Sequence, residues 1–127
     1  MRPTILTVDD AKAVRDLVEK TLSSFACNTT SATNGYNAFF AIESARPDLI
    51  LLDISMPIMG GVETLRRLQA APELREIPVI MLTSRADHTV VPLLAGMGAK
   101  GSLIKPFDEV ALLEKIQSTV PLKRAKA

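Results

Sequence analysis

The sequence lacks several features that would direct it to a special environment or partner. One cysteine, Cys27, excludes an internal disulfide and a cysteine-based zinc site, and it favours a reducing intracellular compartment. No apolar run is long enough to cross a bilayer, and residues 1–3 lead into a strand-like pattern rather than a signal peptide. Fifteen basic and fourteen acidic residues leave a net charge of +1. We therefore expect a cytoplasmic protein whose main partner is neither nucleic acid nor membrane.

The amino-acid composition is typical of a single globular domain. Of the 127 residues, 47% are hydrophobic and 23% are charged, which is enough apolar material to bury one core. Internal repeats and low-complexity tracts are absent from the sequence. We expect one domain over residues 1–121, followed by a disordered basic tail over residues 122–127.

Short apolar runs alternate along the chain with longer segments of helical period. The strand-like runs lie at residues 5–8, 28–33, 49–52, 79–82 and 102–104. The first helix is expected over about residues 12–25, and a further helical segment follows each later strand. Five such units predict an α/β fold in which helices cover both faces of a parallel sheet.

The fourth helical segment is expected to be irregular. Pro92 lies five positions after the expected cap at Asp87, and proline removes a backbone hydrogen bond within a helix. The sequence therefore predicts either a kink or a helix that begins at Pro92. The last helix is expected to be capped by Asp108.

Polar side chains follow four of the predicted strands. They are Asp9 and Asp10 after the first, Asp53 after the third, Thr83 and Ser84 after the fourth, and Lys105 after the fifth. Taken alone, each has an ordinary explanation, such as a helix cap for the first aspartate pair or a simple turn for Thr83. Because ligands bind outside the carboxyl ends of parallel strands, their joint occurrence favours one shared site.

The three carboxylates predict a metal site. Carboxylates at close quarters repel one another unless a cation lies between them, and hard oxygen ligands with room for water suit Mg²⁺. We therefore expect Asp9, Asp10 and Asp53 to form a magnesium site, with the backbone carbonyl of Ser55 as a further ligand.

The same groups predict phosphoryl transfer. This chemistry requires an oxygen nucleophile, a divalent ion and donors for the remaining charge. Asp53 is the expected nucleophile and would form an acyl phosphate. Lys105 and the hydroxyl of Thr83 would bind phosphoryl oxygens, next to Ser84.

Five stretches are informative together: Val8-Asp9-Asp10, residues 51–61, Leu82-Thr83-Ser84, Gly98-Ala99 and Ile104-Lys105-Pro106-Phe107. Through them the sequence resembles the receiver domain of two-component response regulators, and it is close to the single-domain chemotaxis type over essentially its whole length. The resemblance implies a flavodoxin-like (βα)5 fold with strand order 2-1-3-4-5.

The resemblance also implies roles for the site. Asp53 would take a phosphoryl group from a histidine kinase or a phosphotransfer protein, while Asp10 and Asp53 bind Mg²⁺ directly and Asp9 binds it through water. The domain would be a phosphoacceptor that assists its own phosphorylation and dephosphorylation rather than an enzyme. A downstream protein would bind the face made by the fourth helix, fifth strand and fifth helix, with the domain a monomer or a phosphorylation-dependent dimer.

One position departs from the family pattern. Receivers usually carry a tyrosine or phenylalanine on the fifth strand that turns inward as the threonine moves toward the phosphoryl group, and here that position is Ser102, next to Gly101. We therefore expect coupling from Thr83 to run through the backbone of residues 83–87. Ser55 and Arg85 flank the site and are candidates for tuning the lifetime of the acyl phosphate.

Three alternatives remain open. An aspartyl-phosphate phosphatase would need a second aspartate two residues after the nucleophile, where the chain has Ser55. A phosphorylation-independent scaffold would usually have lost one of the site residues, all of which are present. The chain could also be the receiver part of a larger regulator with a DNA-binding or enzymatic output domain.

Overall fold

The computed structural model describes residues 2–125. Helices and strands alternate along the chain. Their bounds are β1 Thr4–Val8, α1 Lys12–Leu22, β2 Asn28–Ala32, α2 Gly35–Ser44, β3 Leu49–Asp53, α3 Gly61–Ala70, β4 Val79–Thr83, the 3₁₀ turn η1 Arg85–Asp87, α4 Val91–Gly96, β5 Gly101–Ile104 and α5 Glu109–Gln117. No helix within the described residues is long and apolar enough to cross a membrane.

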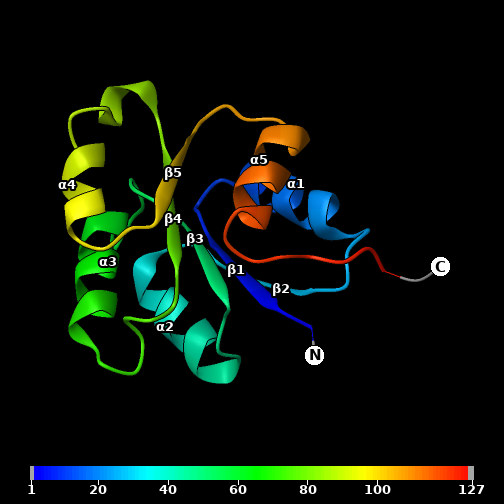
Figure 1. Cartoon of the computed structure of the whole chain (residues 1–127). Coiled ribbons are helices and arrows are strands. Elements are labelled where there is room, and N and C mark those ends of the chain that lie inside the picture. Colours follow the sequence, from blue (N-terminus) through cyan, green and yellow to red (C-terminus); the bar gives the residue numbers. More distant parts are fainter. Residues whose placement is uncertain (1, 126–127) are drawn as a thin grey trace.

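The five strands form one parallel sheet in the order β2-β1-β3-β4-β5 (Figure 1). This confirms the predicted flavodoxin-like α/β fold and its strand order 2-1-3-4-5. Helices α1 and α5 cover one face of the sheet, and α2, α3 and α4 cover the other (Figure 1). The helices lie on both faces because the connections are right-handed and the direction of strand order reverses at β1: β2 lies on one side of it, and β3, β4 and β5 lie on the other.

Two apolar cores lie on the two faces of the sheet. Every residue of β3 is buried, and its leucines and isoleucine alternate between the cores: Leu49 and Leu51 pack with α1 and α5, whereas Ile50 and Leu52 pack with α2, α3 and α4. Near-continuous apolar strands of this kind are typical of a sheet that is covered on both faces. Asp53 is therefore held at the end of a strand that is buried at every residue.

The fourth helical segment begins as the proline predicted. Helix α4 starts at Val91, and Pro92 lies in its first turn, where a missing N–H leaves no helical bond unmade. The expected cap at Asp87 is wrong, because Asp87 lies in η1 and accepts hydrogen bonds from the backbone N and the Oγ of Ser84 at 2.7 and 2.9 Å. The expected cap at Asp108 is confirmed by its hydrogen bond from the N–H of Ala111.

The end of the chain differs from the expected disordered tail. Residues 122–125 run antiparallel to residues 24–26, and backbone hydrogen bonds join the two segments. The guanidinium of Arg124 lies 5.0 Å from the centre of the Phe25 ring, within range for a cation–π contact. Disorder is thus the wrong expectation for residues 122–125, while residues 126–127 lie outside the described part.

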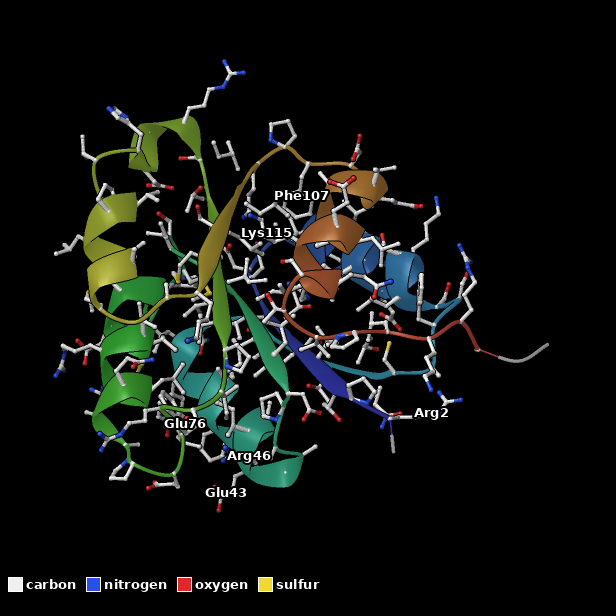
Figure 2. The ribbon with its side chains drawn as sticks, viewed as in Figure 1. Arg2, Glu43, Arg46, Glu76, Phe107 and Lys115 are labelled. Carbon is white, nitrogen blue, oxygen red and sulfur yellow. The ribbon has the colours of Figure 1, made fainter. Side chains whose placement is uncertain are left out.

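The two ends of the sheet differ in character. At the amino ends of the strands, Arg46 donates a hydrogen bond to the carbonyl of Glu73 and so joins the α2–β3 and α3–β4 connections; Figure 2 labels Arg46 at this end. At the carboxyl ends lie the charged and hydroxyl groups that the sequence predicted there, including the segment before Phe107, which Figure 2 labels near α5. The candidate site therefore occupies the end expected for an open parallel sheet.

Candidate functional site

Three carboxylates meet at the carboxyl ends of β1 and β3. One oxygen each from Asp9, Asp10 and Asp53 lies within 4.8 Å of the others. Asp9 is fully buried and Asp53 is 7% exposed, whereas Asp10 is exposed to solvent. The grouping follows from the sheet, because β1 and β3 are hydrogen-bonded neighbours that end at the same level.

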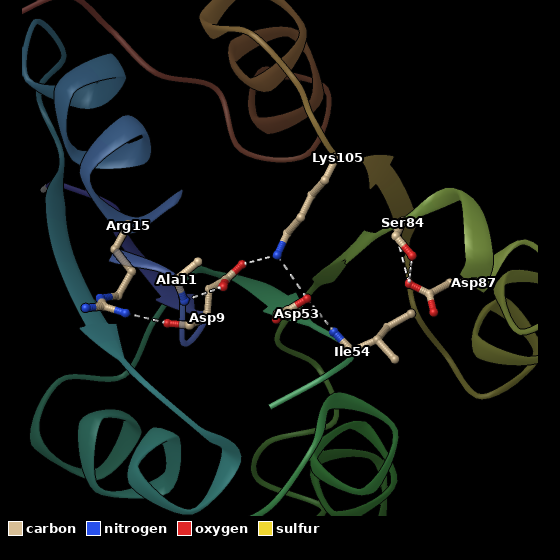
Figure 3. Close-up of polar contacts among 8 residues, drawn as sticks. All are labelled: Asp9, Ala11, Arg15, Asp53, Ile54, Ser84, Asp87 and Lys105. Atoms are coloured by element: carbon tan, nitrogen blue, oxygen red, sulfur yellow. Dashed lines mark hydrogen bonds and ion pairs between the residues drawn. The ribbon is translucent and has the colours of Figure 1, made fainter. Parts of the chain in front are cut away.

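Lys105 reaches into this cluster from the end of β5. Its Nζ lies 2.6 Å from Oδ2 of Asp9 and 3.1 Å from Oδ1 of Asp53 (Figure 3). The segment that carries it is held by a 2.7 Å hydrogen bond from the Lys105 N–H to the carbonyl of Thr83. One ammonium thus faces three carboxylates, and the site attracts further positive charge.

The surroundings shift two pKa values in the site. Burial and the nearby charge of Asp9 raise the pKa of Asp53 above its usual value, although Lys105 and the N–H of Ile54, 3.0 Å from Oδ1, oppose them. Burial alone would lower the pKa of Lys105, but the Asp9 and Asp53 carboxylates outweigh it, and the pKa is raised. Lys105 therefore stays protonated and available as a fixed positive charge.

Asp9 is fixed by backbone as well as by Lys105. Its Oδ1 accepts a hydrogen bond from the Ala11 N–H at 2.9 Å, and its backbone carbonyl accepts one from Nη1 of Arg15 at 2.8 Å (Figure 3). The helix-cap explanation of Asp9 is wrong, because Ala11 is the N-cap residue of α1 and no side chain caps this end of the helix. Arg15 was missed because nothing in the sequence marks a helical arginine as the partner of a strand-end carbonyl.

Gly61 allows the turn after β3 to pack against Asp53. A side-chain carbon on Gly61 would lie 2.1 Å from the carbonyl oxygen of Asp53 and 2.8 Å from Cα of Ile54, so only hydrogen fits there. The turn between them contains Ser55, which is exposed, and Ile58, which is 82% exposed with φ of 69°. The strand end that carries Asp53 is therefore held directly by the start of α3.

The hydroxyl of Thr83 is buried without a partner. Thr83 ends β4 and is 1% exposed, and its Oγ1 has no hydrogen-bond partner. The next two residues, Ser84 and Arg85, are exposed, and Ser84 is engaged by Asp87 rather than by the acidic cluster. Buried polar groups are usually satisfied, so an unpaired hydroxyl at a strand end indicates a place for a ligand.

Ser102 lies apart from the carboxylates. It is partly buried in the middle of β5, opposite Met81 of β4. The structure thus brings together Asp9, Asp10, Asp53 and Lys105, and it places Thr83 at the end of the next strand. The positions proposed for tuning, Ser55 and Arg85, lie on exposed turns at its border.

Comparison with known proteins gives the same assignment. The model of the family described as "Response regulator receiver domain" matches residues 5–117. The chain belongs to this family. Receivers are signalling domains of two-component systems that bind Mg²⁺ at an acidic pocket and interact with histidine kinases or phosphotransfer proteins.

Similar proteins match the receiver over nearly its whole length. The sequence is 32% identical over 123 residues to sporulation initiation phosphotransferase F of Bacillus subtilis strain 168, covering 97% of this chain and 98% of that protein. The structure of the chemotaxis response regulator CheY4 of Vibrio cholerae has a TM-score of 0.87 and 29% identity, covering 94% of this chain and 100% of that one. The receiver domain of the sensor histidine kinase PA1611 of Pseudomonas aeruginosa PAO1, with magnesium in its active site cleft, has a TM-score of 0.82 and 28% identity, covering 94% and 98%.

Proposed function

We propose that Asp53 accepts a phosphoryl group from a histidine kinase or a phosphotransfer protein and that phosphorylation changes binding to a downstream protein. A carboxylate oxygen of Asp53 would attack phosphorus, the bond from phosphorus to the donor nitrogen would break, and an acyl phosphate would form. The observation that supports this most directly is the position of the Asp53 carboxylate at the strand end, beside two further carboxylates and the Lys105 ammonium.

The acidic cluster suits Mg²⁺. Three carboxylate oxygens within 4.8 Å of one another are the hard ligands that this ion prefers. We assign direct binding to Asp10 and Asp53, binding through water to Asp9, and a further contact to the backbone carbonyl of Ser55. When bound, Mg²⁺ would neutralise charge on the phosphoryl oxygens.

Lys105 and Thr83 would bind the phosphoryl oxygens that remain. Lys105 is already charged and 3.1 Å from the Asp53 carboxylate, and the Thr83 hydroxyl has a free donor. Phosphorylation adds only about one negative charge beside the site, so the switch depends on how well these two groups bind the added oxygens. Ser84 lies next to Thr83, and the exposed side chains of Ser55 and Arg85 would tune access of water to the acyl phosphate.

The proposed partner-binding face is made by α4, β5 and α5. Each element carries one large apolar side chain that is more than half exposed: Leu93 at 60%, Ile104 at 55% and Val110 at 66%. Exposed apolar groups on three neighbouring elements are typical of a protein-binding surface. The face also adjoins Thr83, which would transmit the state of the site.

Other parts of the assignment stay predictions. The domain would assist its own phosphorylation and dephosphorylation in the cytoplasm, as a monomer or a phosphorylation-dependent dimer. A phosphorylation-independent scaffold and the receiver part of a larger regulator with a DNA-binding or enzymatic output domain are the alternatives. The complete set of acidic and basic site residues supports the phosphoacceptor over the scaffold.

The direct test uses a small phosphodonor and needs no kinase. Incubation with acetyl phosphate and Mg²⁺ should add one phosphoryl group, seen by intact-protein mass spectrometry and removed by hydroxylamine, which cleaves acyl phosphates. Asp53→Asn should abolish the modification, while Asp16→Asn, at an exposed carboxylate on α1, should leave it unchanged. An unmodified wild-type protein, or a modified Asp53→Asn variant, would contradict the proposal.

A further inference from the structure

A cavity of about 440 Å³ lies between β5 and the start of α4. Its walls are apolar and are formed by Val91 and Pro92 of α4 and by Ile104 of β5. It is open because the β5 residue that faces it, Ser102, has a short side chain, and because the helix begins only at Val91. Its volume falls within the range of about 300–1,000 Å³ that is typical of ligand sites.

The cavity has one buried polar group in its wall. Thr83 lines it, and the Oγ1 of this 1% exposed residue has no hydrogen-bond partner. A buried hydroxyl that lacks a partner destabilises the fold, and an occupant that bonds to it would remove this penalty. The ideal occupant is therefore apolar over most of its surface and carries one hydrogen-bonding group.

Among the residues that line the rim of the cavity, Arg85 carries the one charge, and it is positive. Arg85 and His88 both line it and are exposed, and His88 Nδ1 lies 3.2 Å from the carbonyl of Arg85. Asp87, the acidic residue of the same turn, is engaged by Ser84 through two hydrogen bonds. Charge complementarity favours an occupant with negative groups beside its apolar part.

We propose that this cavity binds the ring of a tyrosine from an acidic segment of a partner protein. The ring would lie between Pro92 and Ile104, its hydroxyl would bond to Thr83, and acidic neighbours would face Arg85. Tyrosine supplies a large apolar body with one polar group at its end, which matches the lining. The identification of the occupant as a partner protein rests on the proposed function. The affinity of the cavity for a phenol is independent of that function.

A second copy of the chain is a poorer occupant. The only tyrosine in the sequence is Tyr36, which is 54% exposed on α2 and packs edge to face with Phe40 at 5.3 Å. Its neighbours Gly35 and Asn37 carry no charge. A tyrosine without acidic neighbours brings no negative charge to face Arg85 at the rim of the cavity.

Small phenols test the cavity on the whole chain. In an amide NMR titration, 4-methylphenol should shift the signals of Thr83, Val91, Ser102 and Ile104 in a saturable way. Toluene has the same ring without the hydroxyl and should bind about fivefold more weakly, the value of one hydrogen bond. Thr83→Val should remove this preference while keeping the shape of the side chain.

Two variants show whether binding uses this cavity. Ser102→Tyr would fill it with the protein's own ring and should abolish binding of 4-methylphenol, whereas Ser31→Tyr, at an exposed position on edge strand β2, should not. If Ser102→Tyr fails to fold, Ile104→Asp gives the same test at a residue that is 55% exposed. Unchanged binding by the variant that folds, or no shifts in the wild type, would overturn the cavity assignment.

Peptides test the occupant. A peptide with one tyrosine among glutamates should bind at least about tenfold more tightly than the same peptide with alanine, and Arg85→Glu should weaken it. Binding of 4-methylphenol without binding of this peptide would overturn the partner assignment in favour of a free small molecule. Self-association that Tyr36→Ala abolishes would overturn it in favour of a second copy.

Phosphorylation of Asp53, measured on the same sample, separates the two proposals. Peptide binding by a protein that fails to accept phosphate would contradict only the proposed function. Phosphorylation without any binding at the cavity would contradict only the inference made here.

Discussion

The ammonium of Lys105 lies 2.6 Å from Oδ2 of Asp9, a carboxylate with no exposed surface. The contact joins β5 to β1, two strands that are separated in the sheet by β3 and β4. It forms because all the strands run parallel and end at one edge, where a long lysine side chain can cross the ends of its neighbours. The pair sets the charge around Asp53, and several predictions depend on it.

Removing the lysine should destabilise the fold. Lys105→Met leaves the buried carboxylate of Asp9 without its cation, which we expect to lower the free energy of unfolding by about 2–3 kcal/mol in urea denaturation without metal. MgCl₂ should restore part of the loss, because a divalent ion would replace the missing charge. Lys100→Met, at an exposed lysine, serves as the control and should change stability by less than about 0.5 kcal/mol. Equal stability of the two variants would contradict the pairing.

Removing the charge of Asp53 should have the opposite effect. Because burial and Asp9 raise the pKa of Asp53, the native state holds the proton more tightly than the unfolded chain does. The contribution of Asp53 to stability therefore falls as pH rises from the usual value of 3.8 through the raised native pKa. Asp53→Asn should be about 1 kcal/mol more stable at pH 7 in EDTA, with a smaller gain near pH 3. A gain that grows toward low pH would refute this sign.

Gly61 should be intolerant of even the smallest side chain. Gly61→Ala would place a carbon against the backbone of Asp53, which cannot move without displacing the strand end, so we expect a loss of about 2–3 kcal/mol and weaker phosphorylation. Gly96→Ala is the matched control, since a carbon added there meets no atom within 4 Å. It should be neutral or slightly stabilising. Thermal unfolding of both variants and phosphorylation by acetyl phosphate would measure the difference.

Ile58 holds a backbone conformation that a β-branched residue rarely adopts. Its φ is 69°, and its side chain is 82% exposed, so little apolar burial compensates for the strain. Ile58→Asn should raise stability by about 1 kcal/mol, because asparagine adopts this conformation more readily. Val110→Asn, at an exposed helical position, should give no gain. A loss of stability in Ile58→Asn would indicate that the side chain makes contacts that its exposure does not suggest.

A phosphoryl mimic should reveal how the site communicates with β5. Beryllofluoride with Mg²⁺ should shift amide signals from Thr83 through α4 to Ser102, and it should change amide exchange in residues 83–87. These changes are expected because the Thr83 hydroxyl would turn from the cavity toward the mimic. Shifts confined to Asp53 and its neighbours, with unchanged exchange in that loop, would instead favour a decoupled phosphate acceptor or a scaffold.

Much of the fold could be predicted from the sequence. The period of the apolar residues identifies the strands and helices, and the alternation of the two types predicts a parallel sheet. Pro92 predicted the late start of α4, because its ring is compatible only with the first turn of a helix. Local patterns were less reliable in two places. Asp87 was expected to cap α4, but its carboxylate accepts hydrogen bonds from Ser84 instead. Residues 122–125 form a short basic segment with no apolar period, so their pairing with residues 24–26 could not be predicted.

The candidate site, like the fold, could be predicted from the sequence only in part. Chain order and strand length were enough to predict the groups that lie at the strand ends, which are Asp9, Asp10, Asp53, Thr83 and Lys105. Three further features became visible only in the folded molecule: Lys105 pairs with Asp9, the Thr83 hydroxyl has no partner, and a cavity opens beside Ser102. These features arise from side chains of different strands meeting across the sheet, and such distances depend on how the layers pack rather than on any local pattern.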